Sequence, residues 1–196
     1  MTFSAVLLAG GESRRMGTDK ATIVFCGAPL WERQLAILRE LRPEKIFVSA
    51  RADPSWRPPE IELLLDEPPA RGPLSGLTRA LERAETSHLI ALAVDMPFMT
   101  TEQMRLLVDL ATTGCGVVPA IGERVEPLAA IYSRESAPNF AETLAGRDFS
   151  LQGLIRQLDA ADKIRLFPVP EKDEHLYRSV NEPGDFKERR FETAAP

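Results

Sequence analysis

The chain has 196 residues, 44% of them hydrophobic, which is enough for a single domain over residues 1–196 with a packed core of its own. Its formal net charge of −5 excludes a general attraction to nucleic acids or anionic membranes, so an anionic ligand would have to be held by local cations. No apolar run approaches the ~18 residues that a membrane span requires, and no secretory leader is recognisable. Cys26 and Cys115 lack metal-binding spacing and are expected to be buried thiols, so the sequence predicts a cytoplasmic protein.

Strand-like and helix-like segments alternate along the chain, which predicts an α/β fold in three layers, with helices on both faces of a mostly parallel sheet. Strand-like apolar runs occur at residues 3–6, 21–25, 45–50, 61–65, 88–94, 116–120, 127–132 and 164–169. Helical patterns occur at residues 29–41, 74–84, 100–110, 138–145, 151–158 and from 184 onward. Trp56 lies in a proline-rich loop and is expected to cover part of the core rather than to bind a ligand.

The most informative stretch, residues 7–20, follows the first strand. Gly10 and Gly11 allow the backbone to turn sharply and to approach a ligand, while Arg15 and Lys20 supply cations. Exposed backbone amides combined with cations suit a polyanion such as a triphosphate. The spacing is neither that of a Walker A loop nor that of the dinucleotide fingerprint. We therefore predict a phosphate-binding loop of another kind.

Two aspartates, Asp66 and Asp95, each follow a predicted strand. An aspartate at such a place is often only a turn former, but ligands of open parallel sheets collect beyond the carboxyl ends of the strands, where the glycine loop also lies. A rigidly held carboxylate beside a triphosphate is what Mg²⁺ requires. The sequence therefore predicts Asp95 as a catalytic metal ligand, with Lys20 and Arg15 as catalytic cations on the phosphates.

Four motifs resemble, in order, those of the molybdenum cofactor guanylyltransferases, within the wider group of nucleotidyltransferases. They are LAGGxSxRMGxDK at residues 8–20, GPLxG at 72–76, DMPF at 95–98 and VNxP at 180–183. Together they extend over nearly the whole chain. The resemblance implies a Rossmann-like nucleotidyltransferase fold, and an enzyme that transfers GMP from GTP to molybdenum cofactor, or to molybdopterin, with Mg²⁺ as cofactor and pyrophosphate as the second product.

The resemblance also implies a set of nucleotide contacts, namely Leu8, Ala9, Gly10, Gly11, Lys20, Asp66 and Asp95. Candidate contacts to the acceptor are Gly72, Gly76, Arg147 and Asn181. The segment 72–76 equally suits an ordinary helix N-terminus with proline in its first turn. Expected partners are GTP, the acceptor and, as further candidates, molybdoenzyme maturation proteins; neither nucleic acid nor membrane is expected, and the chain is expected to be a monomer.

Three positions depart from the guanylyl pattern: Ser49 and Ser179 stand where the family has asparagine, and Glu126 replaces a histidine. These departures leave the phosphate and metal half of the predicted site intact and leave the choice of nucleobase and acceptor open. The alternatives are a cytidylyltransferase acting on molybdopterin, a nucleotidyltransferase for another phosphorylated small molecule, and a nucleotide-binding protein without turnover.

Overall fold

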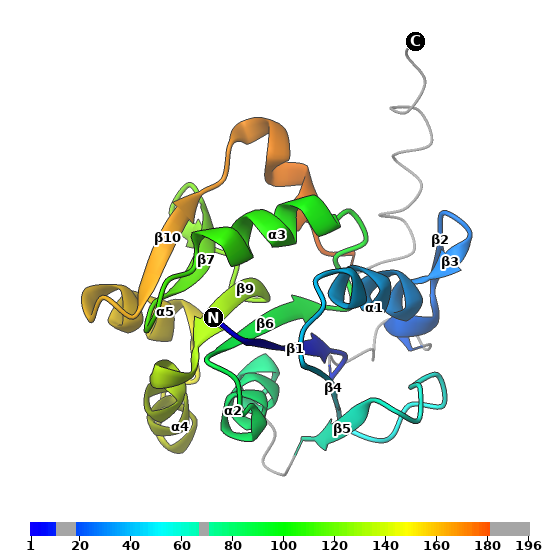
Figure 1. Cartoon of the computed structure of the whole chain (residues 1–196), viewed down its shortest axis with the longest axis horizontal. Coiled ribbons are helices and arrows are strands. Elements are labelled where there is room, and N and C mark those ends of the chain that lie inside the picture. The colour runs from blue at the N-terminus through cyan, green and yellow to red at the C-terminus, as the bar shows by residue number, and fades with distance from the viewer. Residues whose placement is uncertain (11–18, 67–70, 181–196) are drawn as a thin grey trace.

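A computed structural model describes residues 1–10, 19–66 and 71–180 of the chain. Its centre is a twisted sheet in the order β10-β7-β9-β6-β1-β4-β5, with the short β8 paired to β7 (Figure 1). The strands are β1 (Phe3–Leu8), β4 (Lys45–Ala50), β5 (Glu62–Leu65), β6 (His88–Ala93), β7 (Gly116–Ile121), β8 (Arg124–Val125), β9 (Ala129–Ser133) and β10 (Ile164–Pro168). Neighbouring strands are parallel except at β9, which runs antiparallel to β6 and β7, and at β8.

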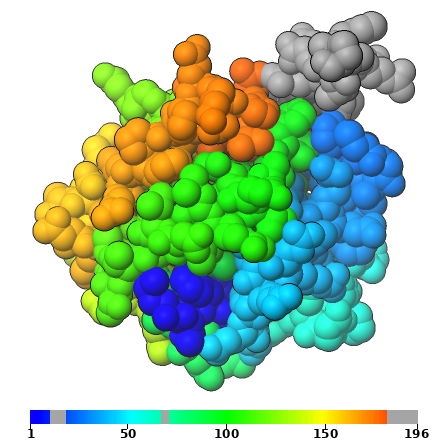
Figure 2. Space-filling view, turned by 45° about the horizontal axis from the view of Figure 1, so that its top comes forward, coloured from blue at the N-terminus to red at the C-terminus, as the bar shows by residue number. Residues whose placement is uncertain are grey.

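Helices cover both faces of this sheet, which confirms the predicted α/β fold (Figure 1). One face carries α1 (Leu30–Glu40) and α3 (Thr101–Leu110), and the other carries α2 (Pro73–Arg83), α4 (Ala137–Ala145) and α5 (Leu151–Ala160). Figure 2 shows α1 and α3 side by side on the first face. None of the helices in the described parts of the chain has the length and apolar character needed to cross a membrane.

The core has two halves because successive side chains of a strand point to opposite faces of the sheet. Ala5 and Leu7 of β1 pack toward α1 and α3, whereas Val6 and Leu8 pack toward α2. All four are buried. The central strand β1 is therefore covered on both sides, which explains its continuous apolar run.

The order of the strands determines where a ligand can bind. From β1 the chain proceeds outward through β4 and β5, then crosses back to form β6 on the other side of β1. The strand order thus reverses around β1, and crevices outside the carboxyl ends of strands form at such points. The loops that follow β1, β4, β5 and β6 all begin at this edge of the sheet.

The region between β1 and α1 differs from the predicted strand at residues 21–25. Residues 20–29 form a short 3₁₀ helix, η2 (Lys20–Thr22), followed by a hairpin of β2 (Val24–Phe25) and β3 (Ala28–Pro29). Cys26 and Gly27 form the tip of the hairpin with φ angles of 48° and 86°, values typical of a two-residue hairpin turn. This turn exposes Cys26, and Cys115 is partly exposed, so the prediction of two buried thiols was wrong.

Two further 3₁₀ helices lie in the described residues, η3 (Arg134–Ser136) and η4 (Glu171–Tyr177), and the sequence pattern predicted neither. The other predicted helices and strands agree with the structure to within a few residues at each end. Thr100 caps α3, because its hydroxyl accepts a hydrogen bond from the Gln103 amide at 3.2 Å. The helix predicted from residue 184 onward lies outside the described residues.

Candidate active site

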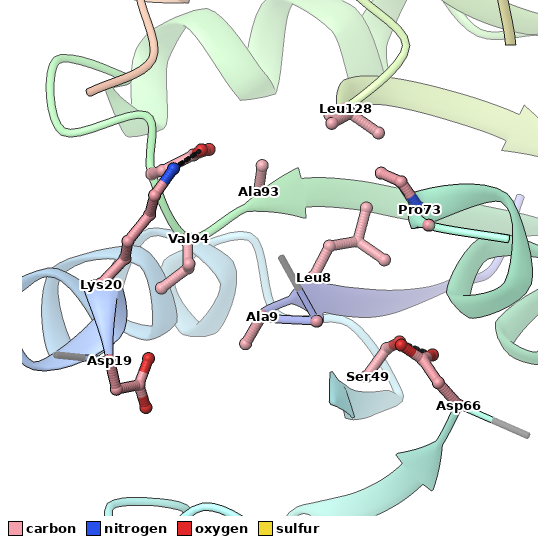
Figure 3. Close-up of a pocket in the computed structure, with 13 residues that line it drawn as sticks. Leu8, Ala9, Asp19, Lys20, Ser49, Asp66, Pro73, Ala93, Val94 and Leu128 are labelled. Carbon is pink, nitrogen blue, oxygen red and sulfur yellow. Dashed lines mark hydrogen bonds and ion pairs between the residues drawn. The ribbon is translucent and has the colours of Figure 1, made fainter. Parts of the chain in front are cut away.

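A pocket lies at the carboxyl ends of β1, β4, β5 and β6 (Figure 3). It encloses about 560 Å³ of space, part of which is open to solvent. Its lining residues are Leu8, Ala9, Gly10, Asp19, Lys20, Ser49, Asp66, Gly72, Pro73, Ala93, Val94, Asp95 and Leu128. Seven of the residues predicted from the sequence are among them: Leu8, Ala9, Gly10, Lys20, Asp66, Gly72 and Asp95.

Lys20 and Asp95 face each other at one end of this pocket. The Lys20 ammonium lies 3.5 Å from the Asp95 carboxylate, and the two side chains are 17% and 24% exposed. Burial raises the pKa of the Asp95 carboxyl above its ordinary value, and the Lys20 ammonium opposes that rise. The pair therefore combines a cation and a carboxylate that are both shielded from bulk water yet open to a ligand.

The backbone around Asp95 is held by three hydrogen bonds. The Val94 amide donates to the Leu8 carbonyl at 3.0 Å, and the Val180 amide donates to the Asp95 carbonyl at 2.8 Å. Behind the turn, the buried Gln34 of α1 donates its side-chain amide to the Met96 carbonyl at 2.6 Å. Hydrogen bonds with β1, with α1 and with Val180 thus all position the Asp95 carboxylate.

Asp66 and Ser49 occupy the opposite end of the pocket from Lys20 (Figure 3). The Ser49 hydroxyl donates to the Asp66 carboxylate at 3.2 Å. Burial is the largest influence on Asp66 and raises the pKa of its carboxyl, against the lowering effects of the Ser49 hydrogen bond and of two arginines, Arg51 and Arg79. At this end of the pocket a serine hydroxyl donates to a carboxylate, whereas at the Lys20 end a cation and a carboxylate form an ion pair.

Two glycines make room for the Asp66 and Ser49 pair. A Cβ on Gly10 would lie 2.6 Å from an Asp66 carboxylate oxygen. A Cβ on Gly76, in α2, would overlap the Ser49 hydroxyl and lie 3.0 Å from the Ser49 Cβ. Gly76 therefore stands behind the pocket wall and supports it, rather than lining the pocket as a ligand contact would.

Gly72 precedes α2 with a φ of 61°, a conformation that favours glycine, and Pro73 follows as the first residue of the helix. Both residues line the pocket. The segment is therefore a helix N-terminus with proline in its first turn, and it also forms part of the pocket wall. Its contact with the acceptor stays a prediction.

Of the other predicted residues that the structure describes, neither Gly76 nor Arg147 lines the pocket. Arg147 is exposed in the turn between α4 and α5, and its neighbour Phe149 packs under the Arg71 guanidinium at 4.0 Å from the ring centre. Arg15, Gly11 and Asn181 lie outside the described residues. Asn181 directly follows Val180, whose amide is bonded to the Asp95 carbonyl.

The sequence analysis missed the roles of Gln34 and Trp56. Trp56 packs against the core as predicted, but its indole N–H also donates to the Asp19 carboxylate at 2.9 Å. Both contacts join residues far apart in the sequence. The only local signal was the presence of a glutamine on the apolar face of a helix, which indicates a buried polar contact without naming the partner.

Among the described residues, no cluster of three or more histidine, cysteine, aspartate or glutamate side chains could hold a metal by itself. Asp95 is a partly buried carboxylate that forms an ion pair with the cation of the pocket. One carboxylate is enough for an ion that takes its other ligands from phosphate and water. The residues present therefore fit a metal that arrives with a phosphorylated ligand.

The sequence matches a known family and several curated proteins. Residues 5–162 match the family described as MobA-like NTP transferase domain. The probable molybdenum cofactor guanylyltransferase of Opitutus terrae is 34% identical over 191 residues, which cover 95% of this chain and 95% of that protein. The protein of the same name from Mycobacterium avium is 36% identical over 195 residues, covering 95% of this chain and 94% of the relative.

Solved structures share the fold. The crystal structure of molybdopterin-guanine dinucleotide biosynthesis protein A from Archaeoglobus fulgidus has a TM-score of 0.75 at 22% identity, over 94% of this chain and 95% of that one. A nucleotidyl transferase from Methanothermobacter has a TM-score of 0.74 at 16% identity, over 95% of both chains. At these identities the likeness concerns the fold alone. The family match and the sequence relatives together show that the chain belongs to the MobA-like NTP transferase domain family.

Proposed function

We propose that this protein transfers GMP from GTP to molybdenum cofactor, or to molybdopterin, and releases pyrophosphate. The observation that carries the proposal is the Lys20 and Asp95 pair at 3.5 Å, in a pocket formed by the loops that the family motifs predicted. Relatives that span nearly the whole chain bear the name of this activity.

In the proposed reaction, the terminal phosphate oxygen of the acceptor attacks the α-phosphorus of GTP. A new bond forms between that oxygen and the α-phosphorus, and the bond from the α-phosphorus to the bridging oxygen of the β-phosphate breaks. The acceptor is already a nucleophile, so positioning and charge neutralisation account for most of the catalysis. Lys20 would stabilise the negative charge on the leaving pyrophosphate.

Asp95 would hold Mg²⁺, because one carboxylate is enough for an ion that takes its other ligands from phosphate and water. When bound, the ion would supply Lewis-acid neutralisation of the phosphate oxygens. Lys20 and Asp95 neutralise each other in the described structure, and a magnesium nucleotide would provide a new partner for each. The site therefore accepts the nucleotide by exchange of ion pairs rather than by burial of unpaired charges.

The nucleobase would lie at the end formed by Ser49 and Asp66. A carboxylate can accept hydrogen bonds from both N1–H and the exocyclic amine of guanine, whereas cytosine presents an acceptor next to its amine. A serine at position 49 keeps the Asp66 carboxylate in place through the 3.2 Å hydrogen bond. We propose guanine on this ground, with cytosine as the alternative to be tested.

Pyrophosphate release distinguishes these functions. The full chain is incubated with Mg²⁺, the acceptor and either GTP or CTP, and a reaction without acceptor serves as control. Acceptor-dependent release from GTP supports the proposal, and release from CTP alone would assign the chain as a cytidylyltransferase. Binding of GTP without release from either nucleotide would leave a nucleotide-binding protein without turnover. The cytoplasmic location, the single domain over residues 1–196 and the monomeric state stay predictions.

A further inference from the structure

The two tryptophans of the chain stack on each other, and one of them is bonded to Asp19 of the pocket lining. Trp56 comes from the loop between β4 and β5, and Trp31 comes from the first turn of α1. Their ring centres are 5.5 Å apart and their planes differ by 15°. Both rings are partly buried against the core, so the stack gives Trp56 a defined orientation.

The Trp56 ring directs its one hydrogen-bond donor at Asp19. The indole N–H donates to one Asp19 carboxylate oxygen at 2.9 Å. The other oxygen accepts from the Ala21 amide at 3.0 Å and thereby caps η2, the turn that contains Lys20. One carboxylate oxygen of Asp19 therefore binds the distant Trp56, and the other caps η2.

Asp19 also holds η2 through its backbone. Its carbonyl accepts from the Thr22 amide at 3.0 Å and from the Thr22 hydroxyl at 2.8 Å. The next bond along, from the Ile23 amide to the Lys20 carbonyl at 3.1 Å, completes the turn. The orientation of Lys20 toward Asp95 thus depends on a turn whose first residue is tied to a distant loop.

We propose that Trp56 is a positioning residue for Lys20, acting through Asp19. A charge-assisted hydrogen bond to a carboxylate is stronger than a neutral one, and the stack with Trp31 leaves the indole little freedom to follow a displaced Asp19. The bond therefore limits the positions that the Lys20 ammonium can take. This inference rests on the proposed function, in which Lys20 contacts the phosphates of the nucleotide.

Trp56→Phe removes the N–H while keeping an aromatic ring on Trp31. Trp31→Phe is the matched control, because it alters the same stack although the Trp31 nitrogen donates no hydrogen bond to the described residues. We expect Trp56→Phe to weaken binding of GTP with Mg²⁺, measured by calorimetry, about five- to twentyfold, and to lower kcat/KM for GTP similarly. For Trp31→Phe we expect less than about a twofold change.

A double-mutant cycle shows whether the effect passes through Lys20. In a Lys20→Ala background, Trp56→Phe should change GTP affinity by less than about twofold, since the group that it positions is gone. Equal losses for the two tryptophan variants, or a full effect of Trp56→Phe without Lys20, would overturn the inference. A wild-type chain that neither binds GTP nor releases pyrophosphate would instead overturn the proposed function.

Asp19→Asn provides a second variant in case Trp56→Phe does not fold. Asparagine is an equally good cap, so η2 can remain, but the amide group that replaces one oxygen cannot accept from the indole. It should weaken GTP binding about as much as Trp56→Phe, and the two changes combined should weaken it no further. Additive losses would show that Asp19 and Trp56 act separately, which contradicts the inference.

Discussion

The Lys20 ammonium lies 3.5 Å from the Asp95 carboxylate, in a pocket shared by the loops that follow β1 and β6. One residue is suited to phosphate and the other to a metal, so the pair contains the two charges that a magnesium nucleotide needs. Because each screens the other in a partly buried site, neither is left as an isolated buried charge. The relationship gives the predictions below.

Asp95→Asn should lower the rate of pyrophosphate release roughly 100-fold or more, because a neutral amide is a poor magnesium ligand and the ion pair of Asp95 with Lys20 is lost. Thermal unfolding should change little, since the variant also removes a carboxylate whose burial is unfavourable. Asp109→Asn, on the exposed side of α3, is the control and should retain wild-type rates. A normal rate in Asp95→Asn would place the metal elsewhere.

Activity should fall on acidification at a higher pH than an ordinary aspartate would produce. Asp95 must be ionised to act, and burial raises the pKa of its carboxyl while Lys20 lowers it. The carboxylate is therefore present above the raised pKa and lost as the pH falls through it. Lys20→Gln should move the acid limb of kcat/KM to higher pH. A limb that stays in place would mean that another group controls it.

Asp66→Asn should stabilise the fold near neutral pH. Burial raises the pKa of the Asp66 carboxyl, so stability from this group is present below the unfolded value and is lost as the pH rises through the folded value. The gain in melting temperature should shrink as the pH approaches the ordinary aspartate value of about 3.9. The same variant should lower the preference for GTP over CTP.

The control for this prediction is Asp53→Asn, because the pKa of the Asp53 carboxyl is shifted downward whereas that of Asp66 is shifted upward. The hydrogen bond from Arg57 lowers the pKa of the Asp53 carboxyl, so its charge favours the folded state at neutral pH. This variant should not gain stability. A lower melting temperature for Asp66→Asn at neutral pH would show that Arg51 and Arg79 outweigh burial at that carboxylate.

Gly76→Ala should destabilise the protein by about 1–3 kcal/mol, because the new methyl group overlaps the Ser49 hydroxyl and would lie 3.1 Å from a Leu8 methyl group. Displacement of Ser49 should also break its bond to Asp66 and weaken nucleotide binding. Urea denaturation and GTP titration measure the two effects. Adding Ser49→Ala should recover part of the stability but not the binding.

Gly153→Ala tests the same change in a helix without the clash. A Cβ at Gly153 of α5 would lie 3.6 Å from its nearest neighbour, which is an ordinary contact. Replacing a helical glycine by alanine should then stabilise the fold by about 0.5–1 kcal/mol. If both alanine variants gain stability, the space behind Ser49 is less restricted than the geometry indicates.

Most of the fold was predictable because its signals are local. The buried run of β6 and the capped pattern of α3 are readable within a few residues. The runs at residues 116–120 and 127–132, which suit a strand pair around the turn at Gly122, do pair as β7 and β9. The local pattern did not indicate that β9 also runs beside β6, or that the short β8 pairs with β7 across that turn. Which strands pair depends on contacts between distant segments, and the local pattern does not contain that information.

The same distinction holds for the site. Asp66 and Asp95 were found because strand ends of one parallel sheet converge, which is a rule about topology rather than about sequence distance. Gln34 and Trp56 were missed because their partners, Met96 and Asp19, lie in other parts of the chain. Nothing near either residue indicates that partner. Ser49 was noted only as a departure from a pattern, and its bond to Asp66 became visible in three dimensions.

The stacked tryptophans also give the protein an intrinsic fluorescence signal. Trp31 and Trp56 are the chain's two indole fluorophores; Trp56 donates to the residue that caps the Lys20 turn, and Trp31 stacks on Trp56. All tryptophan emission therefore arises from one small region at the pocket, without a background from elsewhere in the molecule. Ligand titrations can be followed in the unlabelled protein, and each single-tryptophan variant separates the signal of one ring from that of the other.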